Sequence, residues 1–322
     1  MLSKKTLFPG FALLCNAVLA FESPYAELAS LLKNNACALG SGVMGRSVDA
    51  EKIFPKEGAR PFEIHGMVDY SHENGRRHCS NGGIAFLGFD FDYDNFILKR
   101  TCSMGFFSGF AKNFIHYSCD TLKKGDLHMG FGGYYGNFHI LGVDVSTLSI
   151  FGFGKSNTNC ENFTANGQDF DHFTHGHRIL HSKIDLYYPW KWNDLKIGPN
   201  IALGVDNLKQ KGAEEWDQSA LRLHTIDGIA GIRCEKNYEK FYLQLFLGGE
   251  QNIRKRWSGG EINIDSVGEN FIHSGLDGTK FLATADIHFH WTESIFLDLT
   301  FSGRYGKNDK NSTIAITLNK VF

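Results

Sequence analysis

Apolar and polar residues alternate along the last third of the chain. Between residues 280 and 291 one face carries Phe281, Ala283, Ala285, Ile287, Phe289 and Trp291, and the other carries Lys280, Leu282, Thr284, Asp286, His288 and His290. The alternation resumes after residues 292–294, and it returns in the last ten residues, where Ile314, Ile316, Leu318 and Phe322 share a face. A period of two residues is typical of a β-strand with two different faces. The pattern predicts three consecutive antiparallel strands at the end of the chain.

Such strands suit either a soluble sandwich, which buries the apolar face, or a transmembrane barrel, which turns that face to lipid. The predicted strands approach the ~9–11 residues that cross a bilayer at a tilt, and their connections alternate between short and long. Aromatic residues also lie near the strand ends, where lipid headgroups would be: Tyr70, Tyr134, Tyr135, Tyr187, Tyr188, Trp190, Trp291 and Tyr305. These features favour the membrane barrel.

Extending the pattern through the chain predicts an all-β, antiparallel transmembrane barrel of about twelve strands. We place the strands at 62–72, 82–92, 95–107, 126–135, 137–149, 177–188, 195–206, 220–234, 240–252, 280–291, 295–305 and 313–322. The expected tight turns are Tyr93-Asp94, Gly136, 189–194, 235–239 and 292–294. An even strand number with short turns on one side puts both barrel termini in the periplasm and the long loops outside the cell.

The first twenty residues have the organisation of a secretory signal peptide. Lys4 and Lys5 precede an apolar stretch, and small residues lie around Ala20. A lipoprotein signal ending at Cys15 is the alternative, but Leu14 is larger than the residue usual before such a cysteine. No later run reaches the ~18 apolar residues of a membrane helix. We therefore expect a signal peptide at 1–20, a helix or linker at 21–60 and a barrel at 61–322.

The segment before the barrel is predicted to form one short amphipathic helix. Ser23 is a capping residue with Pro24 at the first helical position, and Leu28, Leu31 and Leu32 form one stripe. The two asparagines that follow, Asn34 and Asn35, are expected to end the helix. This helix either lies in the lumen as a plug or stays on the surface as an unstructured N-terminal piece.

The net charge and the cysteines further restrict the kinds of partner and metal site that the protein is expected to have. With a net charge of −2 and no basic face, the chain is not expected to bind nucleic acid. Beyond the signal peptide an even number of cysteines remains, in a compartment where disulfides persist. These are Cys37, Cys79, Cys102, Cys119, Cys160 and Cys234. The sequence does not choose their pairing, and their spacing is not that of a zinc site.

The layout resembles the autotransporter β-domain, in which a helix threads a twelve-strand barrel. The matching pieces are IAFLGFDFDYDNFILKRTCSMGF, IDGIAGIRCE and a terminal strand closing on Phe322. Two departures are Lys320, where the family has an aromatic or apolar residue, and FYLQLFLGGEQ, which lacks a Trp-x-His-Glu-Phe type of signature. The resemblance implies recognition of the terminal residues Ile314, Ile316, Leu318 and Phe322 by the barrel-assembly machinery. It also implies a secretion role, although about forty residues before the barrel are too few for a passenger domain.

Candidate chemistry is sparse. The segment QDFDHFTHGHRILH offers His172, His175, His177 and His181 as weak metal ligands, but a solvated external loop is the preferred interpretation. His65 with Asp69, or His288 with Asp286, would point inward as in an outer-membrane hydrolase, yet lumenal polar residues are the rule in barrels. Some autotransporters cut themselves between two lumenal asparagines, so the resemblance also draws attention to Asn34-Asn35. We expect no cofactor and no catalysis.

The sequence thus predicts a Gram-negative outer-membrane barrel of autotransporter type. We expect it to act as a translocator, anchor or surface structural protein without a sizeable passenger. The expected partners are outer-membrane lipid and lipopolysaccharide, the barrel-assembly machinery and a separately encoded surface protein. The alternative is a porin-like channel for small solutes, followed by an outer-membrane hydrolase.

Overall fold

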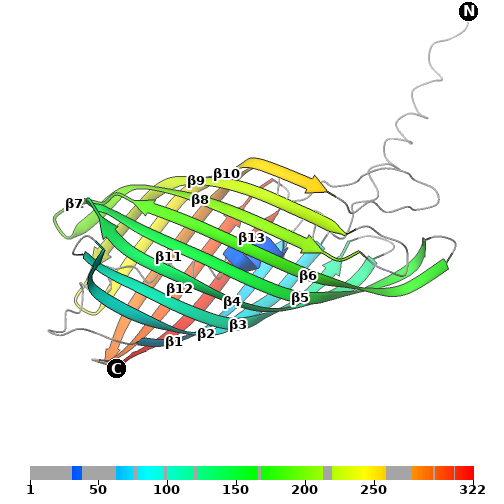
Figure 1. The fold of residues 1–322 in the computed structure, drawn as a ribbon, viewed down its shortest axis with the longest axis horizontal. Helices are drawn as coiled ribbons and strands as arrows, with labels where there is room; N and C mark the ends of the chain where they lie inside the picture. The colour runs from blue at the N-terminus through cyan, green and yellow to red at the C-terminus, as the bar shows by residue number, and fades with distance from the viewer. Residues whose placement is uncertain are drawn as a thin grey trace, which may run out of the picture.

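The computed structural model describes residues 31–37, 63–74, 78–97, 100–118, 122–165, 168–212, 220–258, 278–292, 294–307 and 309–322. Its strands wrap into a barrel with a short helix, residues 31–37, inside it (Figure 1). The strands are β1 (Glu63–Asn74), β2 (His78–Ile97), β3 (Arg100–Tyr117), β4 (Leu122–Ile140), β5 (Val143–Ala165), β6 (Gln168–Tyr187), β7 (Trp190–Trp192), β8 (Leu195–Gln210), β9 (Leu221–Asn237), β10 (Phe241–Ser258), β11 (Thr279–Thr292), β12 (Ile295–Tyr305) and β13 (Lys310–Val321).

Each strand pairs with its neighbours in the chain, and the sheet closes on itself. The first strand pairs antiparallel with the last, from Glu63 opposite Val321 to Asn74 opposite Lys310. β6 pairs directly with β8, because the three-residue β7 is only a short extension paired with β8. The other twelve of the thirteen strands form the wall. The predicted twelve-strand antiparallel barrel is confirmed, and of the two locations considered for the helix the structure shows the lumen.

The two faces of the wall have inverted polarity relative to a soluble protein. On β13, Ile314, Ile316 and Leu318 point outward and are about half exposed, whereas Thr313 and Thr317 on the other face are buried. The same outward exposure of apolar side chains recurs on other strands. A sandwich would bury such residues, so the apolar outer surface is that of a barrel surrounded by lipid. None of the described helical residues forms a segment long and apolar enough to cross a membrane.

Several strands are longer than the sequence pattern predicts. β5 has 23 residues and β12 has 11, so the wall is much taller on one side. The β5–β6 hairpin projects furthest (Figure 1), and its strands include residues 150–165 and 168–176, where the sequence pattern predicts a loop. Backbone pairing continues here beyond the alternating apolar segment, because hydrogen bonds between strands do not require an apolar face.

Two predicted turns are wrong. Gly136 lies inside β4, where it pairs with Met104 and Thr147, and β2 continues past Tyr93 to Ile97. The β4–β5 turn is Leu141-Gly142, with φ values of +51° and +85°. Positive φ at both central residues is the geometry of a two-residue hairpin turn that matches strand twist. Leucine is uncommon in that conformation, so the sequence signal for this turn is weak.

The lumen is divided into an apolar half and a charged half. Buried apolar side chains of β1 to β6 form one hydrophobic cluster, with Met67, Ile84, Phe86, Phe107, Leu127, Met129, Phe131, Ile150 and Ile179 among its members. Buried charged groups dominate the side formed by β8 to β12, including Asp206, Asp227, Arg233, Glu250, Lys280 and Arg304. The expectation of a polar lumen therefore holds on the side of β8 to β12, whereas on β1 to β6 the apolar cluster adjoins buried polar residues such as His65 and Glu73.

Candidate functional site

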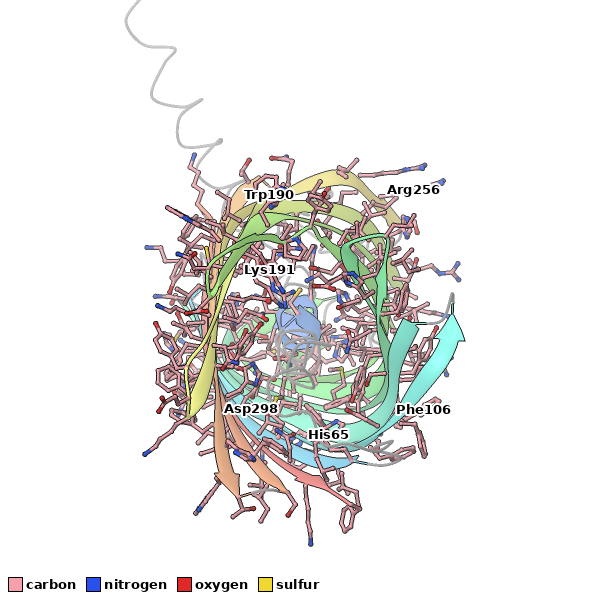
Figure 2. The ribbon with its side chains drawn as sticks, turned by 90° about the vertical axis from the view of Figure 1, so that its left-hand side faces the viewer. His65, Phe106, Trp190, Lys191, Arg256 and Asp298 are labelled. Atoms are coloured by element: carbon pink, nitrogen blue, oxygen red, sulfur yellow. The ribbon has the colours of Figure 1, made fainter. Side chains whose placement is uncertain are left out.

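The helix of residues 31–37 lies within the lumen and is enclosed by the wall (Figure 2). Leu31, Leu32 and Ala36 are at most 1% exposed and belong to the same buried hydrophobic cluster as the apolar half of the lumen. Lys33 and Asn34 make their contacts with charged residues of the wall. The amphipathic sequence thus matches the two-sided lumen. Leu28, which is also predicted for the plug, lies outside the described residues.

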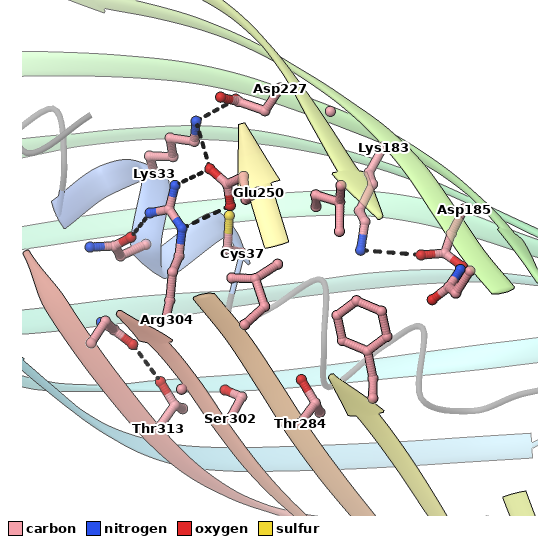
Figure 3. Close-up of a pocket in the computed structure, with 18 of the residues that line it drawn as sticks. Lys33, Cys37, Lys183, Asp185, Asp227, Glu250, Thr284, Ser302, Arg304 and Thr313 are labelled. Atoms are coloured by element: carbon pink, nitrogen blue, oxygen red, sulfur yellow. Dashed lines mark hydrogen bonds and ion pairs between the residues drawn. The ribbon is translucent and has the colours of Figure 1, made fainter. Parts of the chain in front are cut away.

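Lys33 is the centre of a buried charge cluster. Its ammonium group forms an ion pair with Asp227 of β9, and it lies 3.5 Å from Asp206 of β8 and 3.7 Å from Glu250 of β10. Figure 3 shows Lys33 reaching toward Asp227 and Glu250 from the helix. Burial alone would lower the pKa of Lys33, but the nearby carboxylates outweigh that effect and raise it. The lysine is therefore held in its charged form.

Asn34 is bound from two sides. Its side-chain nitrogen donates to Glu73 of β1 at 2.7 Å, and its side-chain oxygen accepts from the Arg304 guanidinium of β12. Arg304 also binds both carboxylate oxygens of Glu250, with Nε 2.9 Å from Oε2. A buried arginine held in this way has a fixed position, because the planar guanidinium matches the carboxylate geometry.

Asn35 completes the attachment by donating to Asn113 of β3 at 2.8 Å. The helix therefore has polar contacts to β1, β3, β8, β9, β10 and β12, which surround the lumen. The expected end of the helix at Asn34 and Asn35 is wrong, since both lie within it. Their side chains bind the wall instead of capping the helix.

A cavity of about 140 Å³ lies beside the helix in the charged half of the lumen. Lys33, Asn34 and Cys37 line it from the helix, and Lys183 and Asp185 line it from β6. Lys183 is 3.5 Å from Asp185 and does not contact the helix (Figure 3). Burial raises the pKa of the Cys37 thiol to about 11. The remaining space accepts a few water molecules, which makes the helix the main obstacle in this part of the lumen.

The histidines predicted as weak metal ligands do not form one site. His172 is exposed on the projecting part of β6, whereas His175, His177 and His181 are buried along its lumenal face. His177 is 2.6 Å from the Ser156 hydroxyl, and His181 is 2.6 Å from Asp206. Among the described residues no group of three or more His, Cys, Asp or Glu is arranged to hold a metal ion.

The inward His–Asp pairs proposed from sequence have other partners. His65 lies 3.4 Å from Asp90, while Asp69 accepts a hydrogen bond from the backbone of Ile84. His288 lies 2.9 Å from Asp298 of the adjacent strand. The terminal residues Ile314, Ile316, Leu318 and Phe322 point outward, each at least half exposed.

Sequence reasoning did not single out Asp206, Asp227, Glu250 or Arg304. Each follows the period-two pattern at a lumenal position, so a charge on the inward face was the available signal. That signal does not identify partners across the lumen. Asn34 and Arg304, for example, are 270 positions apart in the chain.

The closed antiparallel barrel matches solved autotransporter structures in fold. The translocator domain of the autotransporter NalP from Neisseria meningitidis aligns with a TM-score of 0.58 at 11% identity, covering 89% of this chain and 98% of that one. The β-domain of the Bordetella autotransporter BrkA aligns with a TM-score of 0.58 at 9% identity, covering 81% and 99%. The transport unit of AIDA-I from Escherichia coli gives 0.50 at 12%, covering 83% and 92%.

The likeness is one of fold. No protein-family model matches the sequence, and a search of curated proteins finds no significant relative. The chain therefore has the fold of autotransporter translocator domains, with very low sequence identity to them.

Proposed function

We propose that this chain is an outer-membrane barrel of autotransporter type that serves as an anchor or translocator and is closed by its own N-terminal helix. The observation that carries the proposal is the buried contact of Lys33 with Asp206, Asp227 and Glu250. Breaking a buried ion pair by removing one partner typically costs about 3–5 kcal/mol. A helix held by such contacts remains in the lumen at rest.

The proposed orientation follows from the two ends of the barrel. Glu63 and Val321 pair where β1 begins and β13 ends, on the side of the short turns. Three tryptophans are exposed on this side, as expected for an interfacial aromatic belt: Trp190, Trp192 and Trp291. We assign this side to the periplasm and the tall side to the cell exterior. Phe322 and the outward residues of β13 are the proposed signal for the barrel-assembly machinery. A peptide tag inserted at Gly212 should be accessible to antibody on intact cells.

Conductance in planar bilayers tests the closed state. The whole protein should show little steady current, and deletion of Ser23 to Ala59 should produce a large, stable conductance, because the lumenal helix is then absent. Deleting only Ser23 to Ser30 is the control, because it leaves Leu31 to Cys37 and their connection to β1 intact. A steady large conductance in the whole protein would contradict closure and favour the porin-like channel.

The contact between Asn34 and Glu73 favours a second candidate activity, cleavage between Asn34 and Asn35. In this reaction the Asn34 Nδ2 attacks the carbonyl carbon of its own residue, which forms a succinimide and breaks the bond to Asn35. Glu73 takes the Nδ2 proton and transfers it to the departing amine. The hydrogen bond from Arg304 to the Asn34 side-chain oxygen makes the amide proton easier to remove.

The intact mass of protein isolated from membranes tests cleavage. A cleaved population begins at Asn35, and Glu73→Gln should lower the cleaved fraction at least tenfold because the proton acceptor is lost. Asn35→Ala is the control, since it leaves both Asn34 and Glu73 in place. A first residue of Phe21 in all of the wild-type protein would exclude this activity while leaving the anchor role intact.

A further inference from the structure

The expectation that the chain has no basic face is wrong, because basic side chains gather on the outer face of five neighbouring strands, near the tall end of the barrel. All are exposed: Lys155 of β5, Arg178 of β6, Lys209 of β8, Arg222 of β9, and Arg254 and Arg256 of β10. We call these six residues the basic patch. Figure 2 shows Arg256 extending away from the barrel.

Three residues of the basic patch are direct neighbours across the sheet. Arg178 is in register with Lys209, and Lys209 is in register with Arg222. Side chains in such positions start about 5 Å apart, and like charges there destabilise the sheet unless they are neutralised. Within the described part of the chain, no carboxylate forms an ion pair with any of the six residues. The arrangement therefore favours an external anion.

The patch lies directly above the apolar outer surface. On β5 and β6 the next outward residue toward the middle of the barrel is apolar, Phe153 in one strand and Leu180 in the other. On β9 a single polar residue, His224, lies between Arg222 and the outward Ile226. Phe153 is 61% exposed and Leu180 is 41% exposed. The cations are therefore placed at the level of lipid headgroups, where phosphate groups would be found.

An apolar groove of about 600 Å³ runs below the patch on the outer surface. Its floor is low because three of its residues have small or no side chains: Gly228, Ala230 and Gly249. Larger apolar side chains line its sides, including those of Ile184, Leu203 and Ile253. Ile253 adjoins Arg254 in the chain, so the upper end of the groove meets the basic patch. A groove of this shape fits an acyl chain whose headgroup lies among the cations.

We propose that the basic patch and the groove together bind a phosphorylated glycolipid with several acyl chains, the lipid A part of lipopolysaccharide. Five neighbouring strands at about 4.8 Å spacing extend over about 19 Å, which is more than one phosphate covers. A lipid with two phosphates neutralises such a patch better than a phospholipid with one. A second copy of this chain would bring the same cations against each other, so its charge does not fit.

The assignment to the outer leaflet rests on the proposed orientation, but binding can be measured without it. Purified full-length protein in detergent is mixed with lipid A, and bound lipid is counted by native mass spectrometry. Combined substitution Arg178→Gln, Lys209→Gln and Arg222→Gln should weaken lipid A binding at least tenfold. The matched control is Lys191→Gln, Lys236→Gln and Lys240→Gln, which removes three basic residues at the short-turn end of the barrel and should change binding less than twofold.

Further measurements distinguish the contribution of the lipid headgroup to binding from that of the acyl chains. Gly249→Leu should fill the groove and weaken binding without changing charge, since a Cβ there meets its nearest atom, the Lys280 carbonyl oxygen, at 3.7 Å. Heat-dependent gel mobility confirms that each variant is folded. Equal binding of phosphatidylglycerol and lipid A, equal losses in both triple variants, or a change in oligomer mass without a change in bound lipid would overturn the proposal. A failed surface-tag experiment would contradict only the orientation.

Discussion

Replacing Lys33 with methionine should release the lumenal helix and open the barrel. The substitution removes the cation paired with the buried Asp227, whereas Asp206 keeps His181 and Glu250 keeps Arg304 as partners. Uncompensated buried charge of this kind costs about 3–5 kcal/mol. Because the Asp227 carboxylate belongs to the wall, that energy favours the state in which the helix leaves and water reaches it. We expect a conductance approaching that of the helix deletion.

The reactivity of Cys37 gives an independent measurement of the same event. With the helix in place, burial raises the pKa of the Cys37 thiol to about 11, so maleimide labelling at pH 8 should be slow. After release, the midpoint of the labelling rate against pH should fall toward about 8.5. Reduced protein is labelled briefly, and modification of Cys37 is quantified by peptide mass spectrometry.

Lys183→Met is the matched control for Lys33→Met. Lys183 is also a lumenal lysine paired with a carboxylate, Asp185, but it does not contact the helix. Its replacement should leave both the conductance and the Cys37 profile near those of the wild type. If Lys33→Met behaves like this control, the ion pairs of Lys33 do not hold the helix, and closure depends on its other contacts, those of Leu31, Leu32, Asn34 and Asn35.

A second large effect is expected when a charge is placed in the middle of the lipid-facing surface. Ile316→Arg should destabilise the folded barrel by about 2–4 kcal/mol, the range for arginine near the bilayer midplane. Ile316 is half exposed on the outer face of β13 and has apolar neighbours on that face, Ile314 and Leu318. Urea unfolding of the protein in lipid vesicles measures the change.

Ser312→Arg tests whether the effect of Ile316→Arg depends on depth. Ser312 is on the same strand and the same face, next to Lys310 at the polar end. A charge there should change stability by about 0–1 kcal/mol, because the site is near the interface. Equal losses for the two variants would mean that the outer face of β13 does not contact lipid.

The alternating faces were predictable because a strand's period reports directly on its two environments. On β11, the sequence assigns Phe281 and Phe289 outward and Asp286 and His288 inward, and the structure shows the same arrangement. The strand ends were less predictable. Beyond the bilayer both faces are polar, so hydrogen-bonded strands there carry no alternation, as the length of β5 shows.

The site was only partly predictable. Leu31 and Leu32 form a stripe that predicts a helix, and the resemblance suggested the lumen as its location. The polar attachment was not predicted, because neither propensity nor periodicity reports which wall residues lie opposite Lys33. The apolar half of the lumen was also missed, since inward positions such as Phe107 and Phe131 were expected to be polar.

The projecting β5–β6 hairpin also contains a stretch of β6 that is paired on one side only, among the described residues. Pairing of β6 with β8 extends to His177, and one further backbone hydrogen bond joins Lys211 to Gly176. Among the described residues, the part of β6 before Gly176 pairs only with β5. Within the described structure this part of β6 is therefore a sheet edge, a feature which in other proteins invites unwanted strand addition. Asp171 and His172 are exposed on this edge, and their hydration opposes such pairing. The exposed part of the histidine-rich segment first considered for metal binding is therefore expected to oppose aggregation through this edge.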